Sequence, residues 1–428
     1  MSQDYSRHQL VDVADAVRLG ARALARTSTR DRNAALQSMA DALRAHQATI
    51  LEANQRDLDQ AQTKDLDDAF IDRLRLNTER VDHMAQAIEE ILQLPDPIGS
   101  SDEAWTRPNG LKVARRRIPL GTVGMIYESR PNVTSDASAL CLKSGNGILL
   151  KGGSDAFFSN QAIVDALRHG LDASPLPDEA SNALGFVSTK DRQAVQDMLA
   201  LRQQLDVIIP RGGKGLIQFV TEHSQIPVIK HDEGVCHIVV DGSAQPEDIR
   251  SILLNAKTQR PGVCNAVETL LVLQSAVEPH LDDILRTLHD AGVKLHLDDT
   301  AMARANALSI PADKADDEAY LTEYLALELA IRVVDDLDDA IAHIDRYGSQ
   351  HTEAILSDRY DQTQRFIDRV DSSVVLVNAS TRFSDGGQLG LGAEIGISTT
   401  RMHAYGPMGL RELTTTKFVV LGRGQIRN

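Results

Sequence analysis

Apolar residues recur with the period of an α-helix through the first ninety or so positions. In residues 11–25, Val13, Ala16, Val17 and Ala21 fall on one helical face. Asp31 is placed to cap the N-terminus of a second helix that continues from residue 32. The stretch 94–110 is rich in Pro, Gly, Ser and Asp and predicts turns. We therefore expect a helical N-terminal region that ends near residue 94.

Beyond residue 110 the pattern changes to short apolar runs that alternate with amphipathic stretches. Residues 111–128 predict extended chain, with a basic run that suits an edge strand or a hairpin arm. Apolar strands are expected at 121–128, 146–153, 183–188 and 205–213, and helices at 135–145, 155–171, 191–204 and 214–224. A second series starts at 236–242 and ends at 373–380. Strands that alternate with helices indicate βαβ units, so the fold class is α/β with parallel sheets, in two α/β domains plus a small extended element.

Composition narrows the class of protein without naming a function. The chain has 428 residues, which suggests two or three domains. Its net charge of -16 disfavours nucleic acid and anionic membranes as partners. Three cysteines without a CxxC pair favour a reducing cytoplasm over disulfides or a zinc site, so we expect a cytoplasmic protein and no metal. No apolar run is long enough to cross a bilayer.

One cysteine stands where a nucleophile could be presented. In "QRPGVCNAVETLLV", Cys264 follows a Pro-Gly breaker and precedes a predicted strand. A free cysteine usually fills a small apolar hole, so the position alone does not decide between a buried thiol and a nucleophile. No histidine lies close in sequence, which gives no support to a Cys-His protease. Cys141 is expected in the core of a helix, and Cys236 beside His237 at the start of a strand.

Two predicted strand-to-helix joints suit a phosphate-bearing ligand. In "VIIPRGGKGLIQFV", Gly212 and Gly213 precede a helix whose first amides favour an anion. In "NGILLKGG", Lys151 lies at the carboxyl end of a strand, where open α/β sheets bind ligands. Each feature has an ordinary alternative, a tight turn in the first case and a solvated lysine in the second. Neither joint is a GxGxxG or Walker A motif.

Six long motifs closely resemble the gamma-glutamyl phosphate reductase family of the aldehyde dehydrogenase superfamily. They include "IPLGTVGMIYESRPNVTSDASALCLKSGNGILLKGG", "PRGGKGLIQFV", "HDEGVCHIVVD", "QRPGVCNA", "VDSSVVLVNASTRFSDGG" and "LGLGAEIGISTTRMHAYGPMGLREL", in order along nearly the whole chain. The resemblance implies NADPH-dependent reduction of L-glutamate 5-phosphate to L-glutamate 5-semialdehyde and phosphate, a step of L-proline biosynthesis. It makes Cys264 the nucleophile, through a thioester.

The resemblance also implies roles for other residues. Where hydrolytic relatives carry a catalytic Asn, this chain has "ESRPN", so either Arg130 or Asn132 polarises the acyl oxygen or binds the leaving phosphate. The cofactor-binding residues are expected to be Lys151, Ser154, Gly212, Gly213 and Glu323. The small neutral Ser154, where NAD-preferring relatives have a carboxylate, favours NADP(H). Ser380 and Arg382 are the candidates for the substrate carboxylate or phosphate.

The superfamily further implies an aldehyde-dehydrogenase-like architecture. We expect a Rossmann-like cofactor domain over 1–230, with arm strands near 105–118, and a catalytic domain over 231–371. Residues 372–428 are expected to return to the cofactor domain and add an oligomerisation strand, which favours a homo-oligomer. A separate glutamate 5-kinase must supply the labile substrate.

Two other functions are compatible with the fold. One is a hydrolytic aldehyde dehydrogenase acting on another small aldehyde. The "KHDEGVCH" stretch lacks the water-activating motif of such enzymes, although Glu233 is nearby. The other is a non-catalytic member of the superfamily, which would have little reason to keep Cys264, Lys151 and the glycine turns together.

Overall fold

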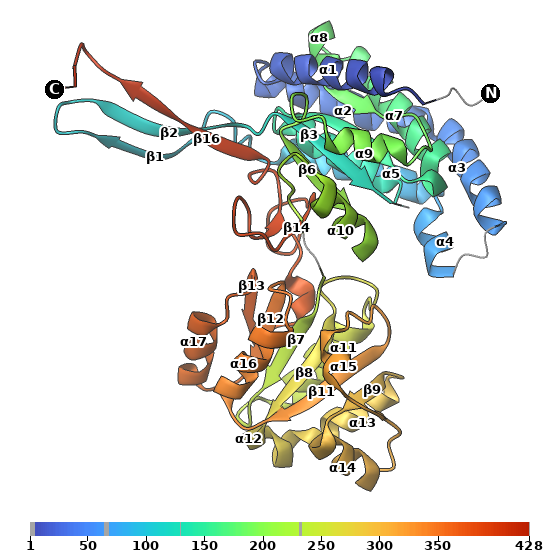
Figure 1. Cartoon of the computed structure of the whole chain (residues 1–428), viewed down its shortest axis with the longest axis vertical. Helices are drawn as coiled ribbons and strands as arrows, with labels where there is room; N and C mark the ends of the chain where they lie inside the picture. Colours follow the sequence, from blue (N-terminus) through green and yellow to red (C-terminus); the bar gives the residue numbers. More distant parts are fainter. Residues whose placement is uncertain (1–4, 64–67, 129, 231–232, 428) are drawn as a thin grey trace. The chain divides into compact units, whose positions relative to one another are not determined.

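The computed structural model describes residues 5–63, 68–128, 130–230 and 233–427. They form two compact units, one made of residues 1–230, 391–396 and 408–428 and the other of residues 231–390 and 397–407. Figure 1 shows the elements of each unit. Along the sequence, the chain changes from one unit to the other in β14 (Gly396–Ser398) and again in β15 (Gly406–Met408). The second unit extends past the boundary expected at residue 371, because the strand at 374–377 pairs within its sheet.

The first unit is built on a four-stranded parallel sheet in the order β5-β4-β3-β6. The strands of this sheet are β3 (Thr122–Tyr127), β4 (Gly147–Gly152), β5 (Leu184–Phe186) and β6 (Val207–Arg211). The helices are α1 (Arg7–Leu24), α2 (Thr29–Ala45), α3 (Gln47–Gln62), α4 (Asp68–Leu74), α5 (Thr78–Gln93), α6 (Asn132–Lys143), α7 (Phe157–Asp172), α8 (Asp178–Ser181), α9 (Gln193–Leu199) and α10 (Lys214–His223), with a 3₁₀ turn η1 (Ser154–Ala156). Strand order reverses direction between β3 and β6, which is where such sheets bind ligands at their carboxyl ends.

Apolar residues from α1, α9 and α10 form one cluster with the sheet, including Val17, Leu149, Met198 and Ile208. The helices α6 and α7 also contact the sheet, and α2 packs against α5, α6 and α7. Burial of these amphipathic helices against a sheet is the stabilising interaction that the 3.6-residue period predicted.

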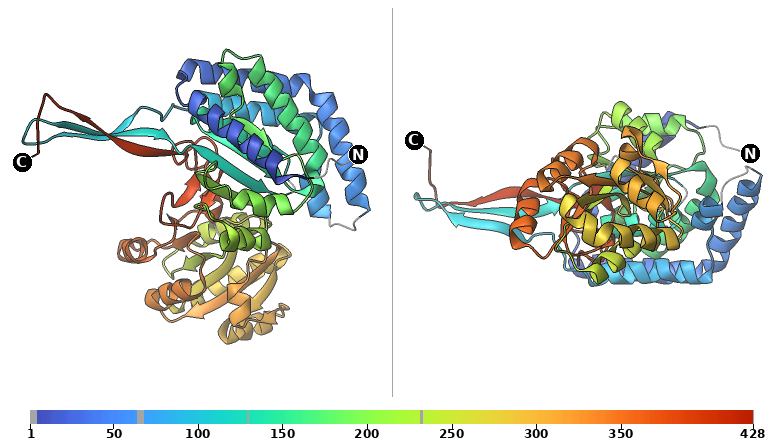
Figure 2. Two further views of the ribbon diagram at one scale, coloured as in Figure 1. Left: turned by 45° about the horizontal axis from the view of Figure 1, so that its top comes forward. Right: turned by 90° about the horizontal axis from the view of Figure 1, so that it is seen from below.

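A three-stranded antiparallel arm belongs to the same unit. It consists of β1 (Ser101–Thr106), β2 (Lys112–Pro119) and β16 (Thr414–Leu421), in the order β1-β2-β16. Both views in Figure 2 show the arm standing clear of the helices of its unit. Trp105 and Phe418 meet edge-to-face on it and remain exposed.

The second unit holds a seven-stranded parallel sheet in the order β10-β9-β11-β8-β7-β12-β13. Its strands are β7 (Cys236–Val240), β8 (Val267–Leu273), β9 (Lys294–Leu297), β10 (Asp313–Lys314), β11 (Glu328–Val334), β12 (Thr352–Leu356) and β13 (Val374–Val377). The helices are α11 (Pro246–Thr258), α12 (Gln274–Ala276), α13 (Asp282–Asp290), α14 (Asp299–Ala307), α15 (Asp317–Leu321), α16 (Leu337–Tyr347) and α17 (Tyr360–Arg369), with a π-helical segment η2 (Val277–Leu281) and a 3₁₀ turn η3 (Thr381–Phe383). Buried apolar clusters enclose this sheet.

Two local expectations were wrong. Ser28, not Asp31, caps α2, because the Ser28 hydroxyl oxygen accepts the Asp31 amide and places Asp31 in the first helical turn. Residues 101–104, which lie in the stretch expected as turn and before the arm strands expected near 105–118, belong to β1 because they pair with β2 across the turn at 107–111. In the part of the chain that the structure describes, no helix is both long and apolar enough to cross a membrane.

Candidate active site

Cys264 lies in the turn that joins α11 to β8, at the amino edge of the second unit's sheet. Its residue is half-buried, whereas Cys141 and Cys236 are fully buried. Because β7 and β8 are parallel and Cys236 pairs with Val267, the start of β7 lies beside this turn. The turn therefore carries a half-buried cysteine next to the buried start of β7.

The backbone of Cys264 packs closely against the segment that leads into β7. The Cys236 thiol donates to the Cys264 carbonyl at 3.1 Å. A Cβ added to Gly234 would lie 2.1 Å from that carbonyl oxygen and 2.7 Å from the Cys264 Cα. On the other side, the Asn265 side chain donates to the Ser384 carbonyl at 2.8 Å. Glycine is thus required at 234 by close approach to the backbone of Cys264.

Two cationic side chains, Arg382 and Arg260, lie near the turn. Arg382 is half-buried and its Nε donates to the Gln259 side chain at 2.8 Å. Burial is the largest cause that lowers the pKa of Arg382, and the nearby Arg260 lowers it further. Cys264 raises this pKa. Arg382 and Arg260 are therefore electrostatic neighbours of each other. Arg382 is also an electrostatic neighbour of Cys264. The predicted residue Ser380 is buried, and its hydroxyl oxygen accepts the Arg382 amide at 3.3 Å, so it fixes the segment that carries Arg382.

A buried ion pair, missed from the sequence, closes the base of the Cys264 turn. Lys257 in α11 and Glu268 in β8 are fully buried, with Nζ 2.5 Å from Oε2. Burial first, and then the nearby charge of Glu323, raise the pKa of Glu268 to about 7, against the opposing effect of Lys257. The predicted residue Glu323 is half-buried, and its effect on Glu268 makes it an electrostatic neighbour of this pair.

More buried polar groups lie along the same sheet edge. His237 Nδ1 lies 2.9 Å from Glu353 Oε2, and neither side chain is exposed. His351 Nδ1 lies 3.6 Å from the Cys236 sulfur and 2.8 Å from the Thr352 hydroxyl. Cys236 and His237 are buried and hydrogen-bonded at the start of β7. Among the described residues, no group of three His, Cys, Asp or Glu side chains is placed to hold a metal ion.

In the first unit, Lys151 lies at the carboxyl end of β4, as predicted. The side chain is buried, and its Nζ donates to the Gly152 carbonyl at 2.9 Å. Burial lowers the pKa of Lys151 to about 8, and Asp191 opposes that shift. Ser154 begins η1 nearby and is exposed. The two residues thus lie at the strand end where an adenosine ribose is expected.

Gly212 and Gly213 connect β6 to α10 at the same sheet edge. The Gly213 amide donates to Glu128 Oε2 at 2.8 Å, and a Cβ on Gly212 would lie 2.5 Å from that oxygen. A carboxylate oxygen thus contacts the amide that precedes α10. A side chain at position 212 would occupy the space next to this amide. These features fit the close approach of a phosphate group to a helix N-terminus.

Arg130 and Asn132 follow β3, also at the carboxyl edge, and both are exposed. The Asn132 side chain donates to Asp136 Oδ2 at 3.0 Å. Burial raises the pKa of Asp136 to about 6, and the bonds from Asn132 and Ser135 oppose it. The structure places the two candidates two residues apart at the entry to α6, so the choice between them stays open. Neither is in the same unit as Cys264.

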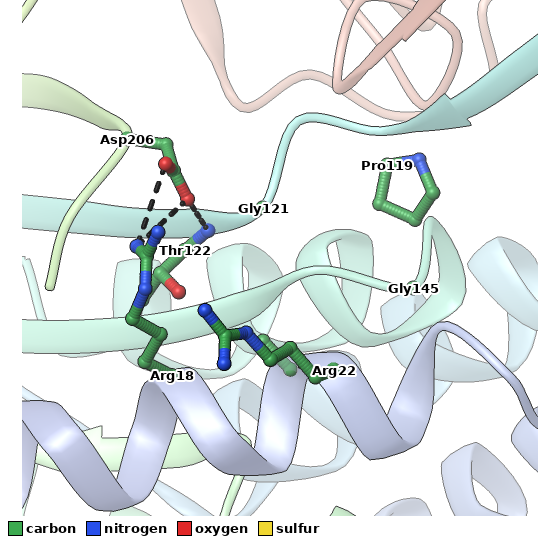
Figure 3. A pocket seen from close by; sticks show the side chains of 8 residues that line it. Arg18, Arg22, Pro119, Gly121, Thr122, Gly145 and Asp206 are labelled. Carbon is green, nitrogen blue, oxygen red and sulfur yellow. Dashed lines mark hydrogen bonds and ion pairs between the residues drawn. The ribbon is translucent and has the colours of Figure 1, made fainter.

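A pocket in the first unit lies away from these residues. It has a volume of about 210 Å³ and is lined by Arg18, Arg22, Thr122 and Asp206, among others. Figure 3 shows Asp206 accepting from the Thr122 amide and facing Arg18. Since Thr122 begins β3, the pocket lies at the amino edge of the sheet. It is therefore separate from the carboxyl edge that carries Lys151 and Gly213.

Comparison with known proteins supplies the family. Residues 2–307 match the aldehyde dehydrogenase family. The gamma-glutamyl phosphate reductase of Salinibacter ruber is 52% identical, over 100% of this chain and 97% of that protein. The protein of the same name from Idiomarina loihiensis is 49% identical over the full length of both. The chain belongs to the gamma-glutamyl phosphate reductase family.

Solved structures agree with this membership. The crystal structure of the gamma-glutamyl phosphate reductase of Thermotoga maritima matches with a TM-score of 0.94 and 44% identity, over 98% of this chain and 100% of that one. An acetylating aldehyde dehydrogenase from Geobacillus thermoglucosidasius, at 14% identity and a TM-score of 0.69, shares the fold. The resemblance, the aldehyde-dehydrogenase-like α/β fold and the assignment as an oxidoreductase are thereby confirmed. Membership of this reductase family implies a nicotinamide cofactor.

Proposed function

We propose that this reductase converts L-glutamate 5-phosphate and NADPH to L-glutamate 5-semialdehyde, phosphate and NADP⁺, through a thioester on Cys264. One observation carries the proposal. The half-buried Cys264 interacts electrostatically with Arg382, and its turn has a backbone packed against Gly234 and bonded to Cys236. The full-length identity to gamma-glutamyl phosphate reductases supplies the substrate class.

In the first step, the Cys264 sulfur attacks the acyl carbon of the substrate. A carbon–sulfur bond forms, the bond between the acyl carbon and the phosphate oxygen breaks, and phosphate leaves with the electron pair. Arg382 provides positive charge near Cys264, and Arg260 lies near Arg382, which favours both the thiolate and an anionic substrate. No water needs to be activated, which agrees with the absence of the water-activating motif from residues 230–237.

In the second step, the thioester carbon is reduced and the carbon–sulfur bond breaks. NADPH supplies the hydride when it is bound. The tetrahedral adduct on Cys264 then collapses to the aldehyde, and the sulfur leaves as the thiolate, so the nucleophile is regenerated. Either Arg130 or Asn132 would hold the acyl oxygen while negative charge develops on it.

The residues at the carboxyl edge of the first sheet suit NADP(H). Lys151 would meet the 2′-phosphate, and Ser154 adds no repelling carboxylate. Gly212 and Gly213 would approach the pyrophosphate at the start of α10, in exchange for the Glu128 carboxylate. Glu323 would bind the hydroxyls of the nicotinamide ribose.

Assembly and location complete the proposal. The arm exposes Phe418, Val420 and Leu421 along β16, at the edge of its three-stranded sheet. An exposed apolar edge strand favours pairing with another chain, so we propose a homo-oligomer that assembles through the arm. The enzyme would act in the cytoplasm, on substrate made by a separate glutamate 5-kinase. A monomer in light scattering would contradict the assembly.

The reverse reaction tests the chemistry, because the forward substrate is labile. Purified protein is mixed with pyrroline-5-carboxylate, NADP⁺ and inorganic phosphate, and NADPH absorbance is followed. The proposal predicts phosphate-dependent NADPH formation that Cys264→Ala abolishes and Cys141→Ala retains. NADPH formation that is independent of phosphate would instead support a hydrolytic aldehyde dehydrogenase. Folded protein with no activity would favour a non-catalytic member of the superfamily.

A further inference from the structure

Lys257 and Glu268 occupy the two ends of the turn that carries Cys264. Lys257 is in the last turn of α11, and Glu268 is the second residue of β8. Besides its 2.5 Å contact with Glu268, Lys257 Nζ donates to the Val267 carbonyl at 3.0 Å. The pair therefore ties the helix end to the strand start on either side of the nucleophile.

Stability alone is a poor explanation for such a pair. Neither side chain is exposed, and removing two charges from water offsets much of their mutual attraction. Buried ion pairs can often be replaced by apolar side chains of similar volume without loss of stability. The remaining contacts of the pair indicate a role in positioning nearby backbone.

The second carboxylate oxygen of Glu268 supplies that contact. Glu268 Oε1 accepts the Leu325 amide at 3.3 Å. Leu325 has a φ of 52°, in the left-handed region that a bulky residue rarely adopts. A Cβ added to Gly262 would lie 3.6 Å from the Leu325 carbonyl oxygen, so the Leu325 segment also packs against the Cys264 turn. Glu268 thus holds a strained residue two positions after Glu323.

We propose that the Lys257–Glu268 pair is a positioning device that sets the Cys264 turn and the Glu323 segment relative to each other. Neither residue touches the reacting atoms. Through the Leu325 amide, Glu268 holds Glu323 in the orientation that receives the hydroxyls of the nicotinamide ribose. This inference rests on the proposed function, because it assigns Glu323 to NADPH.

Two double variants isolate the bond to Leu325. Both remove the charges, but Lys257→Met with Glu268→Gln keeps an oxygen that can accept the Leu325 amide, whereas Lys257→Met with Glu268→Leu has none. We expect the dissociation constant for NADPH to rise about five- to tenfold in the Leu variant relative to the Gln variant, the size of one hydrogen bond. Alkylation of Cys264 by iodoacetamide should proceed equally in both, because both lack the ion pair.

Adenosine 2′,5′-bisphosphate is the matched ligand, since it lacks the nicotinamide ribose. Its affinity should be the same in both variants, which a general loss of structure would not produce. Equal NADPH affinity in the two variants would overturn the inference. A folded wild-type protein that binds no NADPH would instead contradict the proposed function itself.

Hydrogen exchange on the wild-type protein tests the inference without mutation. NADPH should slow exchange in residues 322–327 and in residues 259–266 together, whereas adenosine 2′,5′-bisphosphate should slow neither. If NADPH leaves both segments unchanged, the pair does not couple Cys264 to the cofactor. This measurement remains decisive if the Leu variant fails to fold.

Discussion

The two parallel sheets present their candidate chemistry at opposite edges. In the first unit Lys151, Gly212 and Gly213 lie at the carboxyl ends of the strands, where α10 begins. In the second unit Cys264 lies at the amino end of β8, where α11 ends. The two edges differ electrically, because a helix carries partial positive charge at its N-terminus and partial negative charge at its C-terminus.

This difference explains why the two sites use different groups. At the first edge, backbone amides can bind an anion with little help from side chains. At the second edge, the α11 carboxyl end opposes a thiolate, so positive charge has to come from side chains such as Arg260 and Arg382.

Gly234→Ala should produce the largest effect, at the second edge. The added methyl group would overlap the Cys264 carbonyl oxygen, with a 2.1 Å approach, and would displace Cys264. We expect kcat to fall about 100-fold, as for a misplacement of about 1 Å. Steady-state kinetics of the reverse reaction would measure it. Gly215→Ala is the control, because no atom lies within 4 Å of a Cβ added at that position. Its melting temperature should not fall. An unchanged kcat in Gly234→Ala would show that the turn tolerates movement.

Ser154→Asp should alter the first edge by charge alone. A carboxylate near the 2′-phosphate would repel it, so the ratio of NADPH to NADH affinity should fall about 30-fold while NADH binding is kept. Fluorescence titration with both cofactors measures this. Ser154→Asn is the control of equal size without charge. Equal losses for both cofactors would mean that Ser154 does not face the 2′-phosphate.

Arg382→Met should weaken substrate binding at the second edge about tenfold, in keeping with the loss of one charge-assisted contact. The KM for pyrroline-5-carboxylate or phosphate should rise, while NADP⁺ affinity stays unchanged. Arg382→Lys should recover part of the loss, because the charge is retained without the planar fork. A change confined to NADP⁺ binding would place Arg382 elsewhere in the mechanism.

The pH dependence of NADPH binding should show the smallest effect, through Lys151. Its pKa of about 8 means that the cation is present below pH 8 and is lost as pH rises through that value. NADPH affinity should therefore fall several-fold between pH 7 and pH 9 in the wild type. In Lys151→Met the NADPH affinity should be lower than that of the wild type at pH 7 and should change little between pH 7 and pH 9. Affinity that rises with pH would contradict a role for the lysine cation.

The sequence predicted the α/β fold and its parallel sheets, because apolar runs and amphipathic stretches alternate over most of the chain. Strand order was not readable in the same way, since β11 inserts between β8 and β9 through contacts distant in sequence. Ser28 was missed as a cap because Asp31 is an equally good capping residue by type.

For the candidate site, the resemblance and the turn pointed to Cys264, but nothing in the sequence pointed to its support. Lys257 and Glu268 look like solvated residues in an amphipathic helix and at the start of a strand, and only the packing of α11 on the sheet buries them. Gly234 similarly gave no local signal, because its requirement comes from the backbone of residue 264. Such contacts depend on tertiary structure. The only sequence signal for the buried pair is that a charged residue lies beside an apolar run.

The thioester on Cys264 is the central claim, and mass spectrometry of the digested protein tests it directly. Protein is mixed with pyrroline-5-carboxylate and NADP⁺ without phosphate, quenched in acid and digested. The account predicts that the peptide containing Cys264 gains the mass of a γ-glutamyl group, that phosphate removes it, and that Cys264→Ala never acquires it. NADPH formation without any acylated peptide, or acylation of Cys236 or Cys141 instead, would contradict the account.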